Sequence, residues 1–123
     1  MLRIYLPSGR ALNYISAQLT DDGKIKFAGK NQANGIFGYT DTYGGKLVEN
    51  VVQAIARDCL GESMTRLRDA GYKIVMHIHD EVVIEGDPKD LDDVCSIMGQ
   101  SIGWAEGLIL NAEGYVSNYY KKD

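Results

Sequence analysis

One long stretch of apolar residues at helical spacing limits the folds open to this chain. From Thr42 onward, apolar positions recur every three or four residues over about 25 residues, and Gly61 is a weak point within the pattern. Gly71 follows Ala70 as a C-terminal cap. A helix of this length runs roughly 40 Å, more than a small domain needs for its own core, so the pattern indicates a piece of a larger protein. The apolar positions are Leu47, Val48, Val51, Val52, Ile55, Ala56, Cys59, Leu60, Met64 and Leu67.

Strand-like runs precede this helix. Residues 2–6 and 11–16 are β-prone, and Asp21-Asp22-Gly23 predicts a hairpin turn before an alternating run over 24–28. Residues 29–41 are rich in Gly and Asn and are interpreted as a loop.

A second pair of strand-like runs follows the helix. Residues 73–79 and 82–85 are β-type, and Asp80-Glu81 joins them. The pattern therefore predicts a hairpin with two acids at its tip.

The last third of the chain predicts a shorter helix and one more strand. Asp87-Pro88 is typical of an N-cap followed by proline at the first helical position, and the apolar spacing continues to Ile102. Residues 104–110 lead through a turn into a short final strand. The expected fold class is α+β, an antiparallel sheet whose acidic hairpin packs on one long and one shorter helix.

Composition and charge exclude several classes of protein. The chain has 123 residues, enough for one domain, and 45% apolar with 24% charged residues argues against wholesale disorder. Residues 1–60 hold seven Lys and Arg against five Asp and Glu, whereas residues 61–123 hold six against twelve. The net charge of −4 argues against a free-standing DNA-binding module.

Features of the sequence also indicate the cellular compartment. No apolar run approaches the length of a membrane span, and no signal peptide opens the chain. Cys59 and Cys95 sit among apolar neighbours and are interpreted as reduced core thiols. The expected location is the cytoplasm of a bacterial or phage-infected cell, with no membrane partner.

The residues with chemical potential gather around the acidic hairpin. His77, His79, Asp80, Glu81 and Glu85 lie within nine positions, and adjacent carboxylates supply the oxygen ligands that Mg²⁺ prefers. Three alternatives stay open: a solvated polar turn, a Mg²⁺ site, and a small metal-dependent hydrolase that uses His77, His79 and Asp80. The hydrolase needs another ligand, and this must be an acid because the chain has two histidines. On a strand the two histidines project to one face, and the opposite, packed face carries Ile74, Met76 and Ile78.

Four segments, in order, resemble one known family. Residues 75–85, an apolar strand, His-Asp-Glu and a second apolar strand ending in Glu, look like motif C of family A DNA polymerases. Residues 42–58 resemble the helix before motif C in phage members, and residues 6–14 resemble the Gly-Arg strand of the phage-type palm. Residues 104–108 match the usual end of that subdomain. The resemblance covers nearly the whole chain and implies the C-terminal part of a polymerase palm over 1–123.

This resemblance implies roles for five residues in template-directed DNA synthesis. Asp80 matches the ligand of a two-metal Mg²⁺ site, and Glu81 matches a supporting acid beside the metals. His79 matches the histidine at the primer terminus, and Gln53 matches a glutamine that touches the minor groove of the nascent pair. Arg10 is expected to contact template phosphate or to form a structural salt bridge. The implied partners are primer-template DNA and deoxynucleoside triphosphates.

The sequence also departs from the family pattern. Glu49 stands where the family commonly places Asn, with Asn50 one step later, and His77 stands where cellular members carry glutamine. Motif A, whose aspartate completes the two-metal site, is expected upstream of Met1, together with motif B and the fingers. The thumb and exonuclease regions are also absent from residues 1–123.

These absences lead to expectations for the isolated chain. We expect no primer extension without the upstream polymerase polypeptide, and an exposed apolar flank that supports homodimerisation. A non-catalytic remnant or interaction module is the alternative function. A split-gene product, a prophage remnant and an excised piece of a polymerase are all compatible with the sequence.

Overall fold

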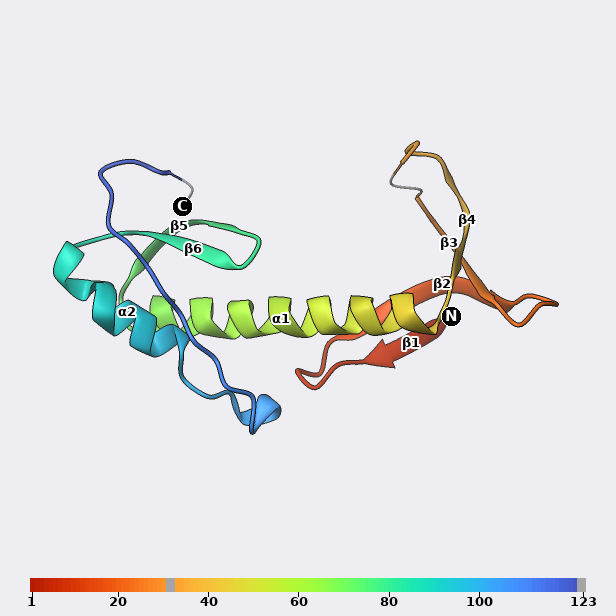
Figure 1. The fold of residues 1–123 in the computed structure, drawn as a ribbon, viewed down its shortest axis with the longest axis horizontal. Coiled ribbons are helices and arrows are strands. Elements are labelled where there is room, and N and C mark those ends of the chain that lie inside the picture. Colours follow the sequence, from red (N-terminus) through yellow and green to blue (C-terminus); the bar gives the residue numbers. More distant parts are fainter. Residues whose placement is uncertain (31–32, 122–123) are drawn as a thin grey trace. The chain divides into compact units, whose positions relative to one another are not determined.

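The computed structural model describes residues 1–30 and 33–121 and has an α+β fold, which confirms the predicted fold class (Figure 1). The chain divides into two compact units, which we call the N-terminal unit, Met1–Ile55, and the C-terminal unit, Ala56–Asp123. The long helix α1 (Gly44–Asp69) begins in the first unit and ends in the second, and Gly61 does not interrupt it. No helix within the described residues is long and apolar enough to cross a membrane.

Four strands form one antiparallel sheet in the N-terminal unit, in the order β1-β2-β3-β4. Strand β2 pairs with both neighbours, because Tyr14 lies opposite Leu2 in β1 and Ile15 lies opposite Ala28 in β3. A register shift between Ile15 and Gln18 accompanies the change of partner, and such shifts bend a strand locally. The strands are β1 (Leu2–Tyr5), β2 (Ala11–Leu19), β3 (Ile25–Lys30) and β4 (Phe37–Thr42).

Tyr14 lies in the core of the N-terminal unit. Its ring meets the Phe27 ring edge-on, with centroids 5.0 Å and planes 79° apart, an arrangement that aromatic quadrupoles favour. Its hydroxyl accepts a hydrogen bond from the Asn50 side-chain amide of α1 at 3.1 Å. Leu6 and Ala54 are also buried, so the sheet and the first turns of α1 share one core.

The prediction of a loop over residues 29–41 is wrong at both of its ends. Strand β3 continues to Lys30 and strand β4 begins at Phe37, and these two residues lie opposite each other. Phe37 and Tyr39 alternate with Gly38 and Thr40, a strand pattern that the Gly and Asn content of the segment obscured. Residues 31–32 of that predicted loop lie outside the described residues.

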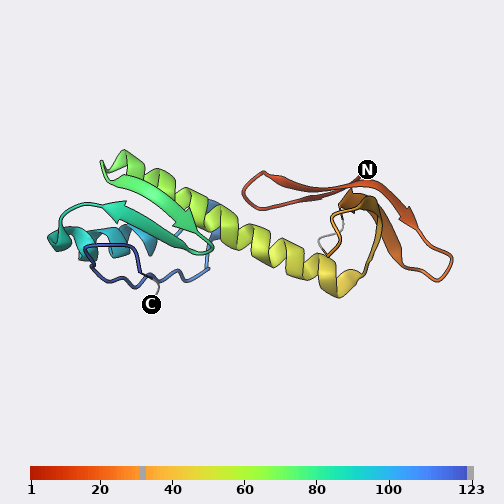
Figure 2. The same ribbon diagram turned by 90° about the horizontal axis from the view of Figure 1, so that it is seen from above.

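The C-terminal unit contains the end of α1, an antiparallel hairpin and a shorter helix. The hairpin of β5 (Lys73–Ile78) and β6 (Glu81–Glu85) lies beside the last turns of α1, and α2 (Leu91–Met98) lies alongside, in both ribbon views (Figures 1 and 2). The buried apolar side chains of this unit are Cys59, Leu60, Leu67 and Ile102. The prediction of reduced thiols agrees with the structure, in which Cys59 and Cys95 are free and burial raises the pKa of the Cys59 thiol.

The end of α1 confirms the predicted glycine cap. Gly71 has a φ of +93°, its amide donates to the Arg68 carbonyl, and the Tyr72 amide donates to the Leu67 carbonyl, both at 3.0 Å. These two bonds are the Schellman motif, which a left-handed glycine permits without steric cost. The chain therefore reverses sharply from α1 into β5.

The second helix begins as predicted but ends early. The Asp87 carboxylate accepts a hydrogen bond from the Lys89 amide at 3.0 Å and caps a 3₁₀ turn, η1 (Pro88–Asp90), which leads into α2. Helix α2 ends at Met98, so its predicted continuation to Ile102 is wrong, because Gly99 caps it.

The predicted final strand over 104–110 is also wrong. A 3₁₀ turn, η2 (Gly103–Ala105), and irregular backbone occupy this segment. Gly107 has a φ of +85°, which interrupts an extended backbone before the apolar residues that follow it. Residues 106–121, which we call the tail, continue in irregular conformation along the C-terminal unit.

Candidate active site

The acidic hairpin forms, with its tip shifted by one residue from the prediction. Ile78 lies opposite Glu81, so the two-residue loop is His79-Asp80 and Glu81 is the first residue of β6. A hairpin this tight aims the loop residues away from the sheet, whereas a strand residue stays on the ladder. Asp80 and Glu81 therefore occupy different structural positions despite their adjacency.

The backbone of His79 carries strain. Its φ is +52°, and within the described residues Ser16 is the other non-glycine residue with a positive φ. The left-handed region costs a non-glycine residue about 1 kcal/mol or more, although histidine tolerates it better than most side chains. Such strain persists where the surrounding structure imposes it, and it is concentrated at functional sites.

The two faces of β5 differ as the alternation predicted. Lys73, Val75 and His77 are exposed, while the intervening positions are half-buried; the half-buried side chains are Ile74, Met76 and Ile78. A register shift between Ile74 and Met76 leaves Val75 without a partner on β6. His79 was expected on the face of His77, but it lies in the loop, where strand alternation no longer applies.

The two carboxylates also differ in their contacts. Asp80 is exposed, and within residues 1–30 and 33–121 its side chain makes no hydrogen bond or ion pair. Glu81 is half-buried, and its Oε1 accepts a hydrogen bond from the Tyr120 hydroxyl at 2.9 Å. This bond, together with desolvation and the Glu81 charge, raises the pKa of the Tyr120 phenol. Asp80 is thus open to an external ligand, and one Glu81 oxygen is held.

His77 has a partner that the sequence did not reveal. Arg57 Nη1 of α1 lies 3.3 Å from His77 Nδ1. Because a guanidinium only donates, Nδ1 is the acceptor when this hydrogen bond forms. This contact links the exposed face of β5 to α1.

The other predicted DNA-contacting residues belong to the N-terminal unit. Gln53 is exposed on α1, and its amide donates to Glu49 Oε1 at 3.3 Å. Arg10 Nη2 donates to the Ala54 carbonyl at 3.4 Å, where the prediction offered a phosphate or a salt bridge. Asn50 is half-buried, and its side-chain amide donates to the Tyr14 hydroxyl at 3.1 Å. Glu49 instead takes the contact with the Gln53 amide.

The described residues do not bring together three metal-ligating side chains of His, Cys, Asp or Glu. This arrangement gives no support to the hydrolase built on His77, His79 and Asp80, because Arg57 already engages the His77 ring. The hairpin offers two adjacent carboxylates as oxygen donors, of which Asp80 has no side-chain partner in the described chain and Glu81 is bonded to Tyr120. Oxygen donors of this kind suit Mg²⁺.

Among known proteins, a phage DNA polymerase is similar to this chain. The chain is 51% identical to a DNA polymerase of Bacillus phage SP02, over an alignment of 130 residues that covers all of this chain. It spans 20% of that relative's length. No family model matches the chain, and no solved structure matches it. The expected resemblance to a phage DNA polymerase is therefore confirmed at the level of one segment of a much longer protein.

Proposed function

We propose that this chain is a palm segment of a family A DNA polymerase and that the β5–β6 hairpin is its motif C. The observation that carries the proposal is the 51% identity to a phage DNA polymerase across the full chain, which includes the β5–β6 hairpin with His79-Asp80 at its tip. The activity would be template-directed transfer of a nucleotide to a primer 3′-hydroxyl. Primer-template DNA and deoxynucleoside triphosphates would be the partners.

Asp80 is the residue that we assign to metal binding. Its carboxylate is exposed on a two-residue loop and free of protein partners in the described chain, so binding a cation would break no existing contact. Bound Mg²⁺ ions supply charge neutralisation for the phosphates, and phosphoryl transfer depends on that neutralisation and on positioning. Two carboxylates of one hairpin are too few for two ions, so we assign a further aspartate to the rest of the polymerase.

The remaining site residues would support the same chemistry. Glu81 holds a fixed negative charge beside Asp80, and its contact with Tyr120 suits a supporting acid. His79 projects from the loop next to Asp80, where it could contact the primer terminus. Gln53 is exposed and available to the minor groove, whose acceptors report pair geometry without sequence.

A chimera tests the assignment of Asp80. The chain would replace the matching fifth of the phage SP02 polymerase, and primer extension would be measured with Mg²⁺ present. We expect synthesis by the parent chimera and loss of at least a hundredfold in Asp80→Asn, because asparagine keeps the size and removes the charge. Glu81→Gln should lose less. The isolated chain should make no product.

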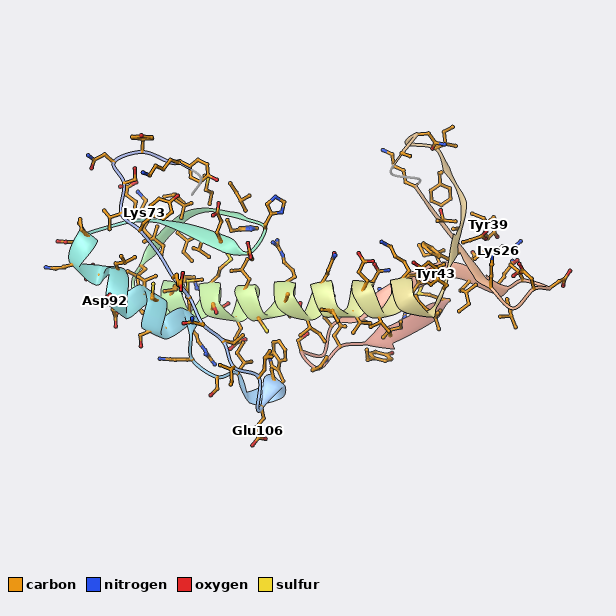
Figure 3. The ribbon with its side chains drawn as sticks, in the orientation of Figure 1. Lys26, Tyr39, Tyr43, Lys73, Asp92 and Glu106 are labelled. Atoms are coloured by element: carbon orange, nitrogen blue, oxygen red, sulfur yellow. The ribbon has the colours of Figure 1, made fainter. Side chains whose placement is uncertain are left out.

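Asp92→Asn is the matched control, because Asp92 is exposed on α2 and forms no side-chain contact in the described chain (Figure 3). It should extend primers like the parent chimera. Thermal melts of each variant establish folding. A folded Asp80→Asn chimera with parental activity would overturn the proposed role of this hairpin.

A further inference from the structure

The tail makes a contact at the acidic hairpin that the proposed polymerase chemistry does not require. Figure 1 shows the tail crossing α2 and returning toward β5 and β6. There the Tyr120 hydroxyl donates to Glu81 Oε1 at 2.9 Å, between residues 39 positions apart. A phenol that donates to an ionised carboxylate makes a charge-assisted bond, which is stronger than a bond between neutral groups.

The tail packs against α2 before the chain reaches the hairpin. Gly114 packs so closely on α2 that a Cβ there would lie 2.8 Å from Leu91 Cδ1 and 3.4 Å from Cys95 Sγ. The Leu110 carbonyl oxygen similarly lies 3.5 Å from the position of a Cβ on Gly99, at the end of α2. The tail backbone therefore lies directly against α2.

A small closed loop then carries Tyr120 to the hairpin. The Tyr115 hydroxyl donates to the Lys121 carbonyl, and Lys121 Nζ lies 5.7 Å from the centroid of the Tyr115 ring. These two contacts join the ends of the segment 115–121, and Tyr120 is one residue from the closure. Tyr120 is less exposed than the preceding Tyr119, at 47% against 71%, and its hydroxyl contacts Glu81.

We propose that the tail is a strap that orients the Glu81 carboxylate and that Tyr120 is a positioning residue of the active site; this inference rests on the proposed function. A glutamate side chain has several rotatable bonds, and ordering it has an entropic cost. The Tyr120 bond holds Oε1 and therefore restricts the orientation of the Glu81 carboxylate. Preorganised charge is what phosphoryl transfer requires.

The contact is tested first in the 123-residue chain, without metal or DNA. The probe is the Tyr120 ring, followed at neutral pH by nuclear magnetic resonance of ¹³C-labelled tyrosine. We expect Glu81→Ala to shift the Tyr120 ring signals, because it removes the carboxylate that accepts the hydrogen bond of the Tyr120 hydroxyl. Tyr119→Phe should leave the Tyr120 signals unchanged. Identical Tyr120 ring signals in wild type and Glu81→Ala would overturn the strap.

The functional part is tested in the chimera with the SP02 polymerase. We expect Tyr120→Phe to lower kcat about three- to tenfold with the KM for nucleotide and primer-template unchanged, since the phenol contacts Glu81 and not the substrate. Adding Tyr120→Phe to Glu81→Ala should cause no further loss, because the partner is already gone. Tyr119→Phe is the matched control and should retain parental kcat.

The failures of the two proposals are distinguishable. A folded Asp80→Asn chimera with parental activity overturns the proposed function and this inference with it. If Asp80→Asn abolishes synthesis while Tyr120→Phe retains parental kcat, the proposed function stands and the strap is wrong. Gly114→Val provides a second variant, because its branched side chain would displace the tail from Leu91, and it should lower kcat like Tyr120→Phe.

Discussion

Asp80 and Glu81 are adjacent in the chain, yet the fold gives their carboxylates different surroundings. Asp80 lies on the loop and is exposed, whereas Glu81 is the half-buried first residue of β6 and accepts a hydrogen bond from the Tyr120 hydroxyl. A free carboxylate can bind a cation without losing a protein contact, and a held one keeps its orientation. We therefore propose different roles for the two residues: Asp80 would bind the Mg²⁺ ion, and Glu81 would assist it.

Substitutions of His79 test whether its left-handed backbone conformation lowers the stability of the chain. We expect His79→Gly to raise the free energy of unfolding of the chain by up to about 1 kcal/mol, because glycine adopts a positive φ without steric cost. His79→Val should lower it, because a β-branched side chain is poorly accommodated there. Urea denaturation measures both, and equal stability of the Gly and Val variants would contradict the left-handed backbone.

His79→Asn separates the two roles. Asparagine tolerates a positive φ, so the variant should unfold at about the same urea concentration as wild type. It lacks the imidazole, so primer extension by the chimera should slow while its Mg²⁺ dependence persists. Parental rates from a folded His79→Asn chimera would remove the histidine from the proposed site.

Two glycines, one within helix α1 and one at its C-terminal cap, have opposite structural demands. Gly61 lies inside the helix with open space where a Cβ would stand, and Gly71 caps the end with a φ of +93°. We expect Gly61→Ala to stabilise the chain by about 1 kcal/mol through helix propensity. Gly71→Ala should destabilise it by about 1 kcal/mol through left-handed strain. Thermal melts with calorimetry measure both, and effects of the same sign would be inconsistent with these two assignments.

A side-chain contact links the turn after α1 to α2. The Tyr72 hydroxyl donates to the Asp93 carboxylate, and this bond raises the pKa of Tyr72 to about 12. The folded state thus favours the neutral phenol, which in an unfolded chain ionises near pH 10. Stability from this bond is therefore fully present below pH 10 and is lost as the pH rises through about 12.

The corresponding experiment compares wild type with Tyr72→Phe between pH 8 and 12. Wild type should be the more stable of the two below pH 10, and the difference in urea midpoint should shrink as the pH rises toward 12. The comparison cancels the contributions of the other tyrosines and of the lysines. A difference that stays constant over this range would show that the Tyr72 bond is not formed in solution.

Each of the two units leaves apolar side chains exposed. Val48 and Val52 lie four residues apart on α1 and are 63% and 59% exposed, and Val75 on the hairpin is 49% exposed. The predicted exposed apolar flank of helix and hairpin is confirmed at these positions. Because the chain spans 20% of its polymerase relative, we propose that these residues contact the rest of such a protein.

In isolation the exposed apolar face of α1 that carries Val48 and Val52 should support self-association. We expect the chain to sediment as a concentration-dependent dimer and the double variant Val48→Lys, Val52→Lys to sediment as a monomer, because lysine removes the apolar patch. Thr65→Lys, at an exposed polar position of α1, is the control and should dimerise like wild type. A wild-type chain that remains monomeric at millimolar concentration would contradict the prediction.

Much of the local structure could be predicted from the sequence. Local interactions decide four of these features: the bounds of α1, the Gly71 cap, the Asp87 cap and the β5–β6 hairpin. Each depends on the spacing of apolar residues or on turn chemistry within a few residues, so the sequence order is enough to predict it. The resemblance to a polymerase could likewise be recognised, because an ordered set of segments carries it.

The tertiary structure decided the rest, because those features join residues that no local pattern relates. Pairing with β3 makes Phe37–Thr42 a strand despite its glycine-rich neighbourhood, and the tail, left without a partner strand in the described chain, stays irregular. Contacts across 20 and 39 residues pair Arg57 with His77 and Tyr120 with Glu81. Periodicity and composition do not encode contacts over such sequence separations, so the partners of His77 and Glu81 became visible only in the folded chain.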